Sequence, residues 1–297
     1  MKKLLALLLI VLLALPLGGC GAETEEITVV ATFYPVYILA KNVLDGVSGV
    51  SLTSMTPPST GCLHDYQLLT GDMRTLSTAR ALIINGAGME DSFLPVIKSR
   101  FAGLTLVDCA QGVPLLSADE HADEDHGEYN AHIWLDPHNA MQMVENIRSA
   151  MVELLPGQAD RINANAAQYT QRLTDLDAEL AAAISALPNK KIVTFHEAFP
   201  YFARAYGLDV VAVVTSDPDT PLSSRMLSDV IAAVKEAGNP PLFSEPLYGD
   251  TAVRTVARST GAKVYELDPL VTGDGALTAY EDVMRANLAV LREALGQ

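Results

Sequence analysis

Short apolar runs alternate with amphipathic stretches along most of the chain. Runs rich in β-branched residues, such as 27–32, predict buried strands, and stretches with apolar residues every three or four positions predict helices. Strands that alternate with helices predict mostly parallel sheets flanked by helices, and therefore an α/β fold. The expected strands are 27–32, 50–55, 81–85, 104–107, 191–195, 210–214, 241–244 and 263–267, and the expected helices are 37–44, 65–77, 93–100, 139–155, 198–206, 223–237, 252–260 and 280–295.

One long helical stretch, 158–187, divides the chain into two α/β halves. Its apolar stripe at Leu173, Leu176, Leu180 and Ile184 has helical spacing, which predicts burial along one side. With 297 residues, the chain exceeds what one hydrophobic core usually serves. We therefore expect two lobes joined by a stiff helix, with the N-terminal lobe at 27–157, the linking helix at 158–187 and the C-terminal lobe at 188–297.

The stretch 115–130 interrupts this regular pattern. It is rich in Asp and Glu, shows no apolar periodicity and carries two imidazoles, at His121 and His126. Such a composition predicts a solvated acidic loop. The loop could gather a metal ion weakly, as an auxiliary site, or it could be an insertion without a role in binding.

The first residues are typical of a targeting segment. A basic start, an apolar run too short for a comfortable membrane span and small residues before Cys20 predict a secretory signal at 1–19. The segment 17–20, Leu-Gly-Gly-Cys, resembles a bacterial lipobox, whose cysteine is acylated after cleavage. This resemblance implies a lipidated leash at 20–26 and an extracytoplasmic protein anchored to the cell membrane. An ordinary cleaved signal with an incidental cysteine is the alternative.

The net charge of −16 makes nucleic acid a poor candidate partner, because binding to its phosphates depends on Lys and Arg side chains. The same charge is compatible with the attraction of a small cation. Cys62 and Cys109 are isolated in the sequence and form no Cys-x-x-Cys motif. A disulfide between them stays open for an exported protein. On this evidence Cys62 is not expected to be a metal ligand.

Four residues with metal-binding side chains follow, or lie close to, the C-terminal ends of predicted strands, and one of them opens the segment 132–137. They are His64, His132, His196 and Asp268. Ligands of open α/β sheets bind outside the carboxyl ends of the strands, and two candidates fall in each half, so a site between the lobes is natural. Imidazole and carboxylate donors suit Zn²⁺. Taken singly, each of the four more often has an ordinary structural role, since a lone His is usually a surface or core residue and an Asp before Pro usually forms a turn.

Four segments carry a resemblance to a known family: 61–66 (GCLHDY), 132–137 (HIWLDP), 196–202 (HEAFPYF) and 267–270 (LDPL). In this order they resemble the zinc and manganese solute-binding proteins of ABC importers (cluster A-I), and the resemblance spans the whole mature chain. It implies two α/β lobes bridged by one rigid helix, with the metal in the cleft, held by His64, His132, His196 and Asp268. The chain departs from the family where Cys62-Leu63 precede His64, since relatives commonly carry Pro-His there, and this bears on the conformation of that loop.

The ligand set that the resemblance implies favours zinc over manganese. Manganese-type relatives tend to have Glu in place of His196, whereas three imidazoles with one carboxylate suit Zn²⁺. Glu197 and Glu245 could serve as a fifth ligand or as acceptors for an imidazole N–H, or they could be ordinary structural carboxylates.

The sequence therefore predicts high-affinity capture of Zn²⁺, as the transported ligand, outside the cytoplasm and its delivery to the permease of an ABC importer. We expect a monomer without enzymatic activity. The alternatives are a manganese-binding member of the same family, a secreted zinc hydrolase with Glu197 as general base, and a surface adhesin. No His-Glu-x-x-His motif supports the hydrolase, and nothing in the sequence specifies a partner for an adhesin.

Overall fold

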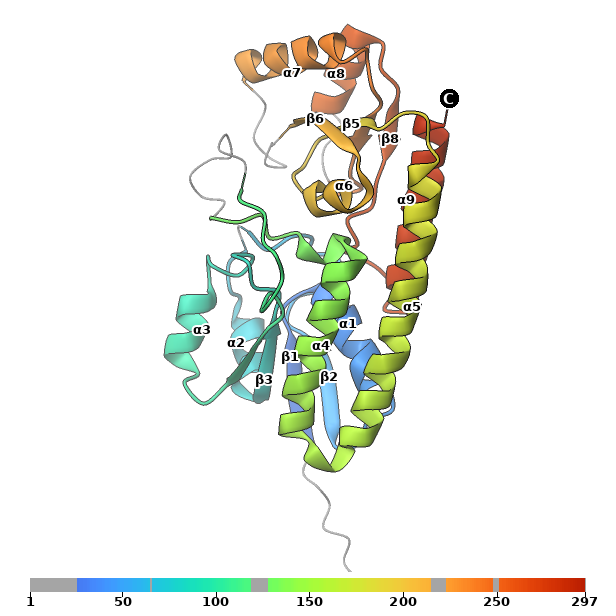
Figure 1. Cartoon of the computed structure of the whole chain (residues 1–297). Coiled ribbons are helices and arrows are strands. Elements are labelled where there is room, and N and C mark those ends of the chain that lie inside the picture. The colour runs from blue at the N-terminus through green and yellow to red at the C-terminus, as the bar shows by residue number, and fades with distance from the viewer. Residues whose placement is uncertain (1–25, 65, 119–127, 215–222, 248–250, 297) are drawn as a thin grey trace, which may run out of the picture.

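The computed structural model describes residues 26–64, 66–118, 128–214, 223–247 and 251–296. Two α/β lobes lie along one long helix (Figure 1), which confirms the predicted fold class. The predicted signal at 1–19, Cys20, His121 and His126 lie outside the described residues. Among the helices that are described, none is both long and apolar enough to cross a membrane.

The N-terminal lobe contains a sheet of four parallel strands in the order β2-β1-β3-β4. Central strand β1 is buried over its last three residues, as expected of a strand with neighbours on both edges. Helix α1 packs against β1, β2 and β3, and α4 packs against β4. The elements are β1 (Ile27–Ala31), α1 (Tyr34–Leu44), β2 (Val50–Ser54), α2 (Thr70–Ser77), β3 (Ala79–Ile84), α3 (Leu94–Arg100), β4 (Thr105–Asp108) and α4 (Pro137–Leu154).

The C-terminal lobe repeats this topology with a parallel sheet in the order β6-β5-β7-β8. In both lobes the first strand lies between the second and the third. Val193, Leu242, Val253 and Val256 form part of a separate small core of this lobe. The elements are β5 (Lys191–Thr194), α6 (Pro200–Tyr206), β6 (Asp209–Val213), α7 (Ser224–Glu236), β7 (Leu242–Ser244), α8 (Thr251–Thr260), β8 (Val264–Glu266) and α9 (Ala279–Leu295).

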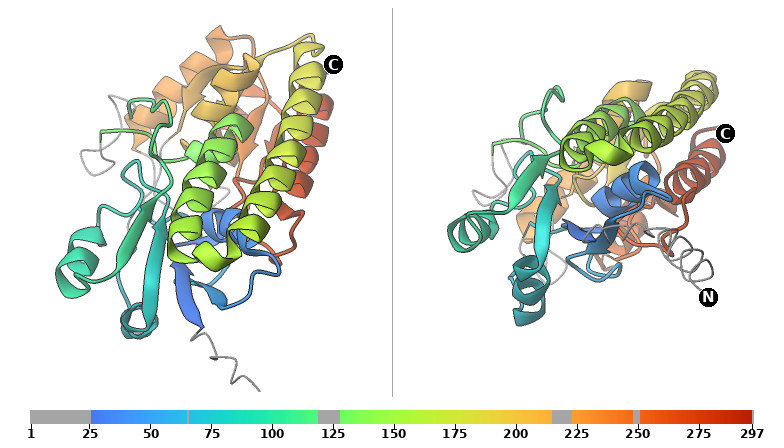
Figure 2. Two further views of the ribbon diagram at one scale, coloured as in Figure 1. Left: turned by 60° about the horizontal axis from the view of Figure 1, so that its bottom comes forward. Right: turned by 90° about the horizontal axis from the view of Figure 1, so that it is seen from below.

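Helix α5 (Ala159–Ser185) is the predicted linking helix, and its 27 residues extend over about 40 Å. The predicted apolar stripe is fully buried, at Leu173, Leu176, Leu180 and Ile184. The helix packs against α1 and α4 in the N-terminal lobe and against α6 in the C-terminal lobe. Helix α9 runs beside it (Figures 1 and 2), so the end of the chain returns along the linking helix.

Polar contacts fix α5 to both lobes. The Asn165 amide donates hydrogen bonds to the carbonyls of Val43 and Asp45, at 3.0 and 2.8 Å. Farther along the helix, Asp177 accepts a 2.8 Å hydrogen bond from the Tyr206 hydroxyl of α6. Because each of these bonds joins a different lobe to the same helix, α5 restrains their relative movement.

Several helix starts differ from the predicted ones, for example α1 at Tyr34 and α6 at Pro200, and two of the differences have a local reason. The helix expected at 65–77 begins only at Thr70, because Asp72 accepts hydrogen bonds from the Leu69 N–H and the Tyr66 hydroxyl and caps the helix there. Helix α4 begins at Pro137, where Asp136 accepts a 2.9 Å hydrogen bond from the His138 N–H.

Candidate metal centre

The predicted ligands lie in loops beyond the carboxyl ends of the two sheets. His64 follows β2, His196 follows β5 and Asp268 follows β8, while His132 immediately precedes a 3₁₀ turn (Ile133–Leu135) that leads into α4. In the C-terminal lobe the strand order reverses between β5 and β7, and His196 and Glu245 come just after these two strands. Such a switch point is where open α/β sheets bind their ligands.

Three imidazoles from distant parts of the chain meet at this place. The ring centroid of His132 lies 5.2 Å from that of His64 and 4.7 Å from that of His196. The donor atoms of His64, His132 and Glu197 lie within 4.8 Å of one another, and so do those of Cys62, His132 and His196. The structure therefore brings three of the four predicted ligands together, around a shared His132.

His132 is held in one orientation by Asn130. The Asn130 side-chain oxygen lies 3.3 Å from His132 Nδ1 and also accepts the His132 main-chain N–H at 3.0 Å. Because an amide oxygen only accepts hydrogen bonds, Nδ1 carries the proton and Nε2 offers its lone pair to the cluster. The Asn130 amide in turn donates to the Glu197 carbonyl at 2.8 Å, which joins the two lobes beside the site.

The turn after His132 is anchored by buried aromatic residues. Trp134 is fully buried, and its indole N–H donates a 2.8 Å hydrogen bond to the Pro269 carbonyl. The Tyr280 hydroxyl of α9 donates to the Trp134 carbonyl at 2.7 Å. Phe33 packs edge-on against the indole, with ring centroids 5.2 Å apart. These contacts fix the main chain from which His132 projects.

His196 is oriented by a carboxylate instead of an amide. Its Nδ1 lies 3.1 Å from both carboxylate oxygens of Glu245, and both residues are buried. A carboxylate at Nδ1 fixes the proton there, turns Nε2 toward a metal and makes it a better donor. The geometry therefore favours the acceptor role for Glu245, whereas Glu197 belongs to a group of potential ligands.

Asp268 stands apart from both groups of donor atoms that the described residues form. Its Oδ1 accepts the Leu270 N–H at 2.7 Å, and Asn287 holds its main chain by two hydrogen bonds. Leu270 has a φ of 61°, an uncommon conformation for a branched residue and one often found near functional sites. Burial raises the pKa of the Asp268 carboxyl. Its role as a ligand stays a prediction.

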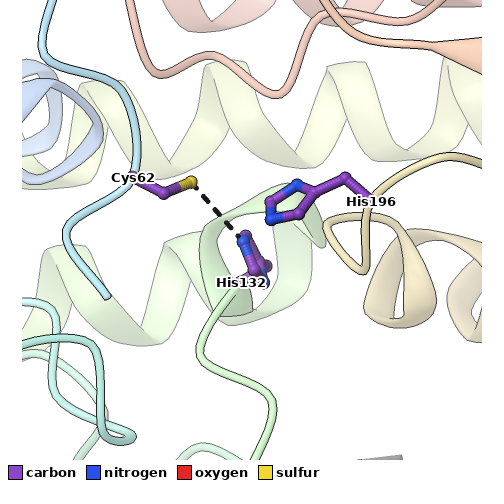
Figure 3. Close-up of side chains that lie close together, drawn as sticks. All are labelled: Cys62, His132 and His196. Atoms are coloured by element: carbon purple, nitrogen blue, oxygen red, sulfur yellow. Dashed lines mark hydrogen bonds between the residues drawn. The ribbon is translucent and has the colours of Figure 1, made fainter. Parts of the chain in front are cut away.

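Cys62 enters the cluster although it was not expected to be a ligand. Its sulfur lies 3.5 Å from His132 Nε2, and Figure 3 shows Cys62, His132 and His196 pointing toward one another. Burial raises the pKa of the Cys62 thiol, and the nearby carboxylates of Glu245 and Glu197 add to this. Cys62 and Cys109 are both free thiols, so the disulfide left open by the sequence is not formed.

The chemistry of this donor set suits a divalent cation. Imidazole, thiol and carboxylate groups converge, and the carboxylates of Glu197 and Glu245 are each only 3% exposed. Buried carboxylates are costly unless they are hydrogen-bonded, paired with a positive charge or bound to a metal. A metal ion at the cluster would supply that positive charge.

Comparison with known proteins finds relatives whose names describe zinc or manganese binding. Zinc-binding protein AdcA of Streptococcus pyogenes serotype M6 is 30% identical over 90% of this chain, which spans 56% of AdcA, about half its length. Manganese-binding lipoprotein MntA of Halalkalibacterium halodurans is 28% identical, with both chains covered completely. The crystal structure of ZnuA superposes with a TM-score of 0.78 at 26% identity, covering 91% of this chain and all of that one.

A family model supports the same relationship over nearly the whole chain. It describes ZnuA, the periplasmic component A of a zinc-uptake complex, and it matches residues 29–294. The matched region includes both lobes, the linking helix and every donor residue of the cluster. The chain therefore belongs to the ZnuA family of zinc-uptake components.

Proposed function

We propose that this protein captures Zn²⁺ outside the cytoplasm and delivers it to the membrane permease of an ABC importer. The observation that carries the proposal is the convergence of His64, His132 and His196, whose rings come from three separate segments and meet between the lobes. Family membership supports a role as the solute-binding component of such a system. Zn²⁺ is the transported ligand and not a resident cofactor.

Zinc is preferred to manganese because of the donor atoms. Imidazole nitrogens suit Zn²⁺, whereas Mn²⁺ sites are rich in carboxylate and water oxygens. We propose His64, His132, His196 and Asp268 as the ligands. Glu197 is a candidate for a fifth position beside them, and Glu245 positions His196. The manganese alternative is supported by the likeness to MntA, whose name describes manganese binding.

Metal titration of the metal-stripped protein tests the proposed function. Calorimetry with Zn²⁺ and then with Mn²⁺ should give one tight Zn²⁺ site and much weaker binding of Mn²⁺. Tight Mn²⁺ binding with weak Zn²⁺ binding would favour the manganese alternative. Weak binding of both ions would overturn the proposal.

The place of action follows from the predicted lipobox. We propose that Cys20 is acylated, that 20–26 forms the leash and that the protein is a monomer anchored at the outer face of the cell membrane. The relative from Streptococcus pneumoniae named zinc-binding lipoprotein AdcA supports this. Replacement of Cys20 by Ala should release the protein from membrane pellets into the soluble fraction, and light scattering of the released form measures its mass.

We propose no catalytic activity for this protein. A catalytic zinc usually has three protein ligands and an open position for water, whereas this cluster offers two overlapping groups of three donors around one imidazole. The hydrolase alternative requires turnover of ester, phosphate or peptide substrates by the zinc-loaded protein, and assays of these three classes decide it.

The acidic loop is proposed as an auxiliary element that the main site does not need. Its two ends are held together by a bridge between Ser117 and Tyr129, with a 3.1 Å hydrogen bond from the Ala118 N–H to the Glu128 carbonyl. Deletion of 118–128 removes His121 and His126 and joins Ser117 directly to Tyr129, which already lie side by side. The shortened protein should therefore fold and keep one tight Zn²⁺ site in calorimetry. Loss of all zinc binding would show that the main site has been assigned wrongly.

A further inference from the structure

Cys62 occupies a position that neither the expected ligand set nor the fold explains. Its side chain leaves the loop after β2, and its sulfur points between the imidazoles of His132 and His196 (Figure 3). The other described cysteine, Cys109, is fully buried at the end of β4 and lies in the hydrophobic core. The chain thus places one thiol in the core and one among metal-binding side chains.

The distance between the sulfur and the nearest imidazole fits a shared metal ion. Tetrahedral zinc with bonds of about 2.3 Å to sulfur and about 2.0–2.1 Å to nitrogen places these two atoms about 3.6 Å apart. Cys62 Sγ and His132 Nε2 are separated by 3.5 Å, and His196 provides a third donor within 4.8 Å of both. The two imidazoles turn Nε2 toward the sulfur because Asn130 and Glu245 lie at their Nδ1 atoms.

His132 belongs to two donor groups of different chemical character. On one side it joins Cys62 and His196, which gives sulfur and nitrogen donors, and on the other it joins His64 and Glu197, which gives nitrogen and oxygen donors. A tetrahedral ion takes four donors, so Cys62 can join the three imidazoles only in the position proposed above for Asp268, which stands apart from both groups. Thiolate favours zinc, whereas carboxylate is also well suited to manganese.

We propose that Cys62 binds the captured metal ion directly as a thiolate, together with His132 and His196, and that it makes the site selective for Zn²⁺ over Mn²⁺. This inference rests on the proposed function, because the ion is the same transported cargo. On binding, the S–H bond breaks, the Zn–S bond forms and the proton passes to solvent. Cys62 then joins the imidazoles in a mixed sulfur and nitrogen site.

Cobalt substitution tests the thiolate bond directly. The metal-stripped protein is titrated with Co²⁺, which gives an intense sulfur-to-cobalt charge-transfer band in the near ultraviolet only when a thiolate is bound. The band should appear in the wild type, vanish in Cys62→Ser and persist in Cys109→Ser, which is the matched control. A thiol with a merely structural role would not produce this band.

Affinity measurements on the same variants test selectivity. Cys62→Ser should lower the Zn²⁺ affinity by at least about tenfold and change the Mn²⁺ affinity little. The ratio of the Zn²⁺ affinity to the Mn²⁺ affinity should therefore fall. Cys109→Ser should keep the wild-type preference. An unchanged ratio of the two affinities in Cys62→Ser would overturn the selectivity part of the proposal.

Alkylation of the wild type provides a test that needs no variant. With saturating Zn²⁺, iodoacetamide should label Cys62 much more slowly than in the metal-free protein, as identified by peptide mass. Tight Zn²⁺ binding without the cobalt band and without protection of Cys62 would overturn this proposal and leave the proposed function standing. Absence of tight Zn²⁺ binding would instead overturn the proposed function.

Discussion

The two lobes each place a buried carboxylate at the same topological point and use it differently. In the N-terminal lobe, Glu90 joins Thr32, just after β1, to Asn85 and Gly86, just after β3. In the C-terminal lobe, Glu245 follows β7 and faces His196, which comes after β5. Both carboxylates therefore lie where the strand order of their sheet reverses.

The difference lies in what each carboxylate meets. Glu90 accepts the Thr32 hydroxyl and the Asn85 N–H at 2.8 Å, and the Gly86 N–H at 3.0 Å, so it is committed to fixed donors of the fold. Gly86 has a φ of +77°, and an added Cβ would lie 2.1 Å from an Asp108 oxygen, so the tight loop requires glycine.

Glu245 meets an imidazole whose other nitrogen faces the donor cluster. Its negative charge therefore acts on a candidate metal ligand and not on the main chain. The same position in the fold is therefore structural or functional according to whether the group that the carboxylate contacts has a second atom able to bind a metal.

The largest change in Zn²⁺ affinity is expected from replacing His196, the imidazole that Glu245 contacts. His196→Ala should lower Zn²⁺ affinity by more than about 100-fold, since loss of an outer partner alone typically costs about 10–100-fold. Calorimetry measures the affinity, and thermal unfolding of the metal-free variant controls for the fold. A loss below tenfold would mean that His196 is not a ligand and that Glu245 is as structural as Glu90.

Glu90 is expected to make the stability of the fold depend on pH. Burial raises the pKa of Glu90 to about 7, against three hydrogen bonds that lower it. Between its ordinary value of 4.5 and about 7 the folded state holds the proton that the unfolded chain has lost, so stability falls as pH rises through this range and levels off above it. The fall is on the order of 3 kcal/mol at most.

Denaturant unfolding of the metal-free protein at a series of pH values measures this slope. Glu90→Gln has no proton to lose and should flatten the fall, even though its amide fits the three donors poorly and lowers stability at every pH. Equal slopes in the wild type and the variant would show that Glu90 is ionised throughout and that its hydrogen bonds outweigh its burial.

Replacing Glu245 and replacing Glu90 should also have different effects on the Zn²⁺ affinity of the protein. Glu245→Gln keeps an acceptor for His196 Nδ1 and removes the charge, so Zn²⁺ affinity should fall about 10–100-fold. Glu90→Gln is the matched control and should leave the affinity nearly unchanged, since Glu90 is bonded to the sheet ends and not to an imidazole. Calorimetry at one pH compares the two, and equal losses would contradict the distinction between the lobes.

The fold could be predicted from the sequence because its signals are local. Strand 27–32 and the stripe along α5 each follow from the periodicity of a single segment, and the structure contains both. The start of α2 was predicted too early because Asp72 caps the helix at Leu69, and this interaction has no signature in the apolar pattern.

The site could be predicted only in part, because half of its chemistry depends on contacts between distant segments. His64, His132 and His196 stand in recognisable segments and converge in the structure. Cys62 has no partner at metal-binding spacing in the sequence, and Asn130 is an ordinary loop residue until the fold places it at His132 Nδ1. Such residues acquire their roles from tertiary structure.

The smallest effect is expected from losing the hydrogen bond that the Thr32 hydroxyl donates to Glu90. Thr32 is fully buried, and Thr32→Val replaces its hydroxyl by a methyl group of similar size. Loss of this one hydrogen bond should cost about 1 kcal/mol at low pH and somewhat more when Glu90 is ionised, because bonds to charged groups are stronger. The bond favours the ionised carboxyl, so its removal should raise the pKa of Glu90 further and extend the fall in stability to higher pH. Denaturant unfolding across pH measures this shift, and Zn²⁺ affinity should stay at the wild-type value. A change in affinity instead would mean that the N-terminal carboxylate, like Glu245, acts on the metal site.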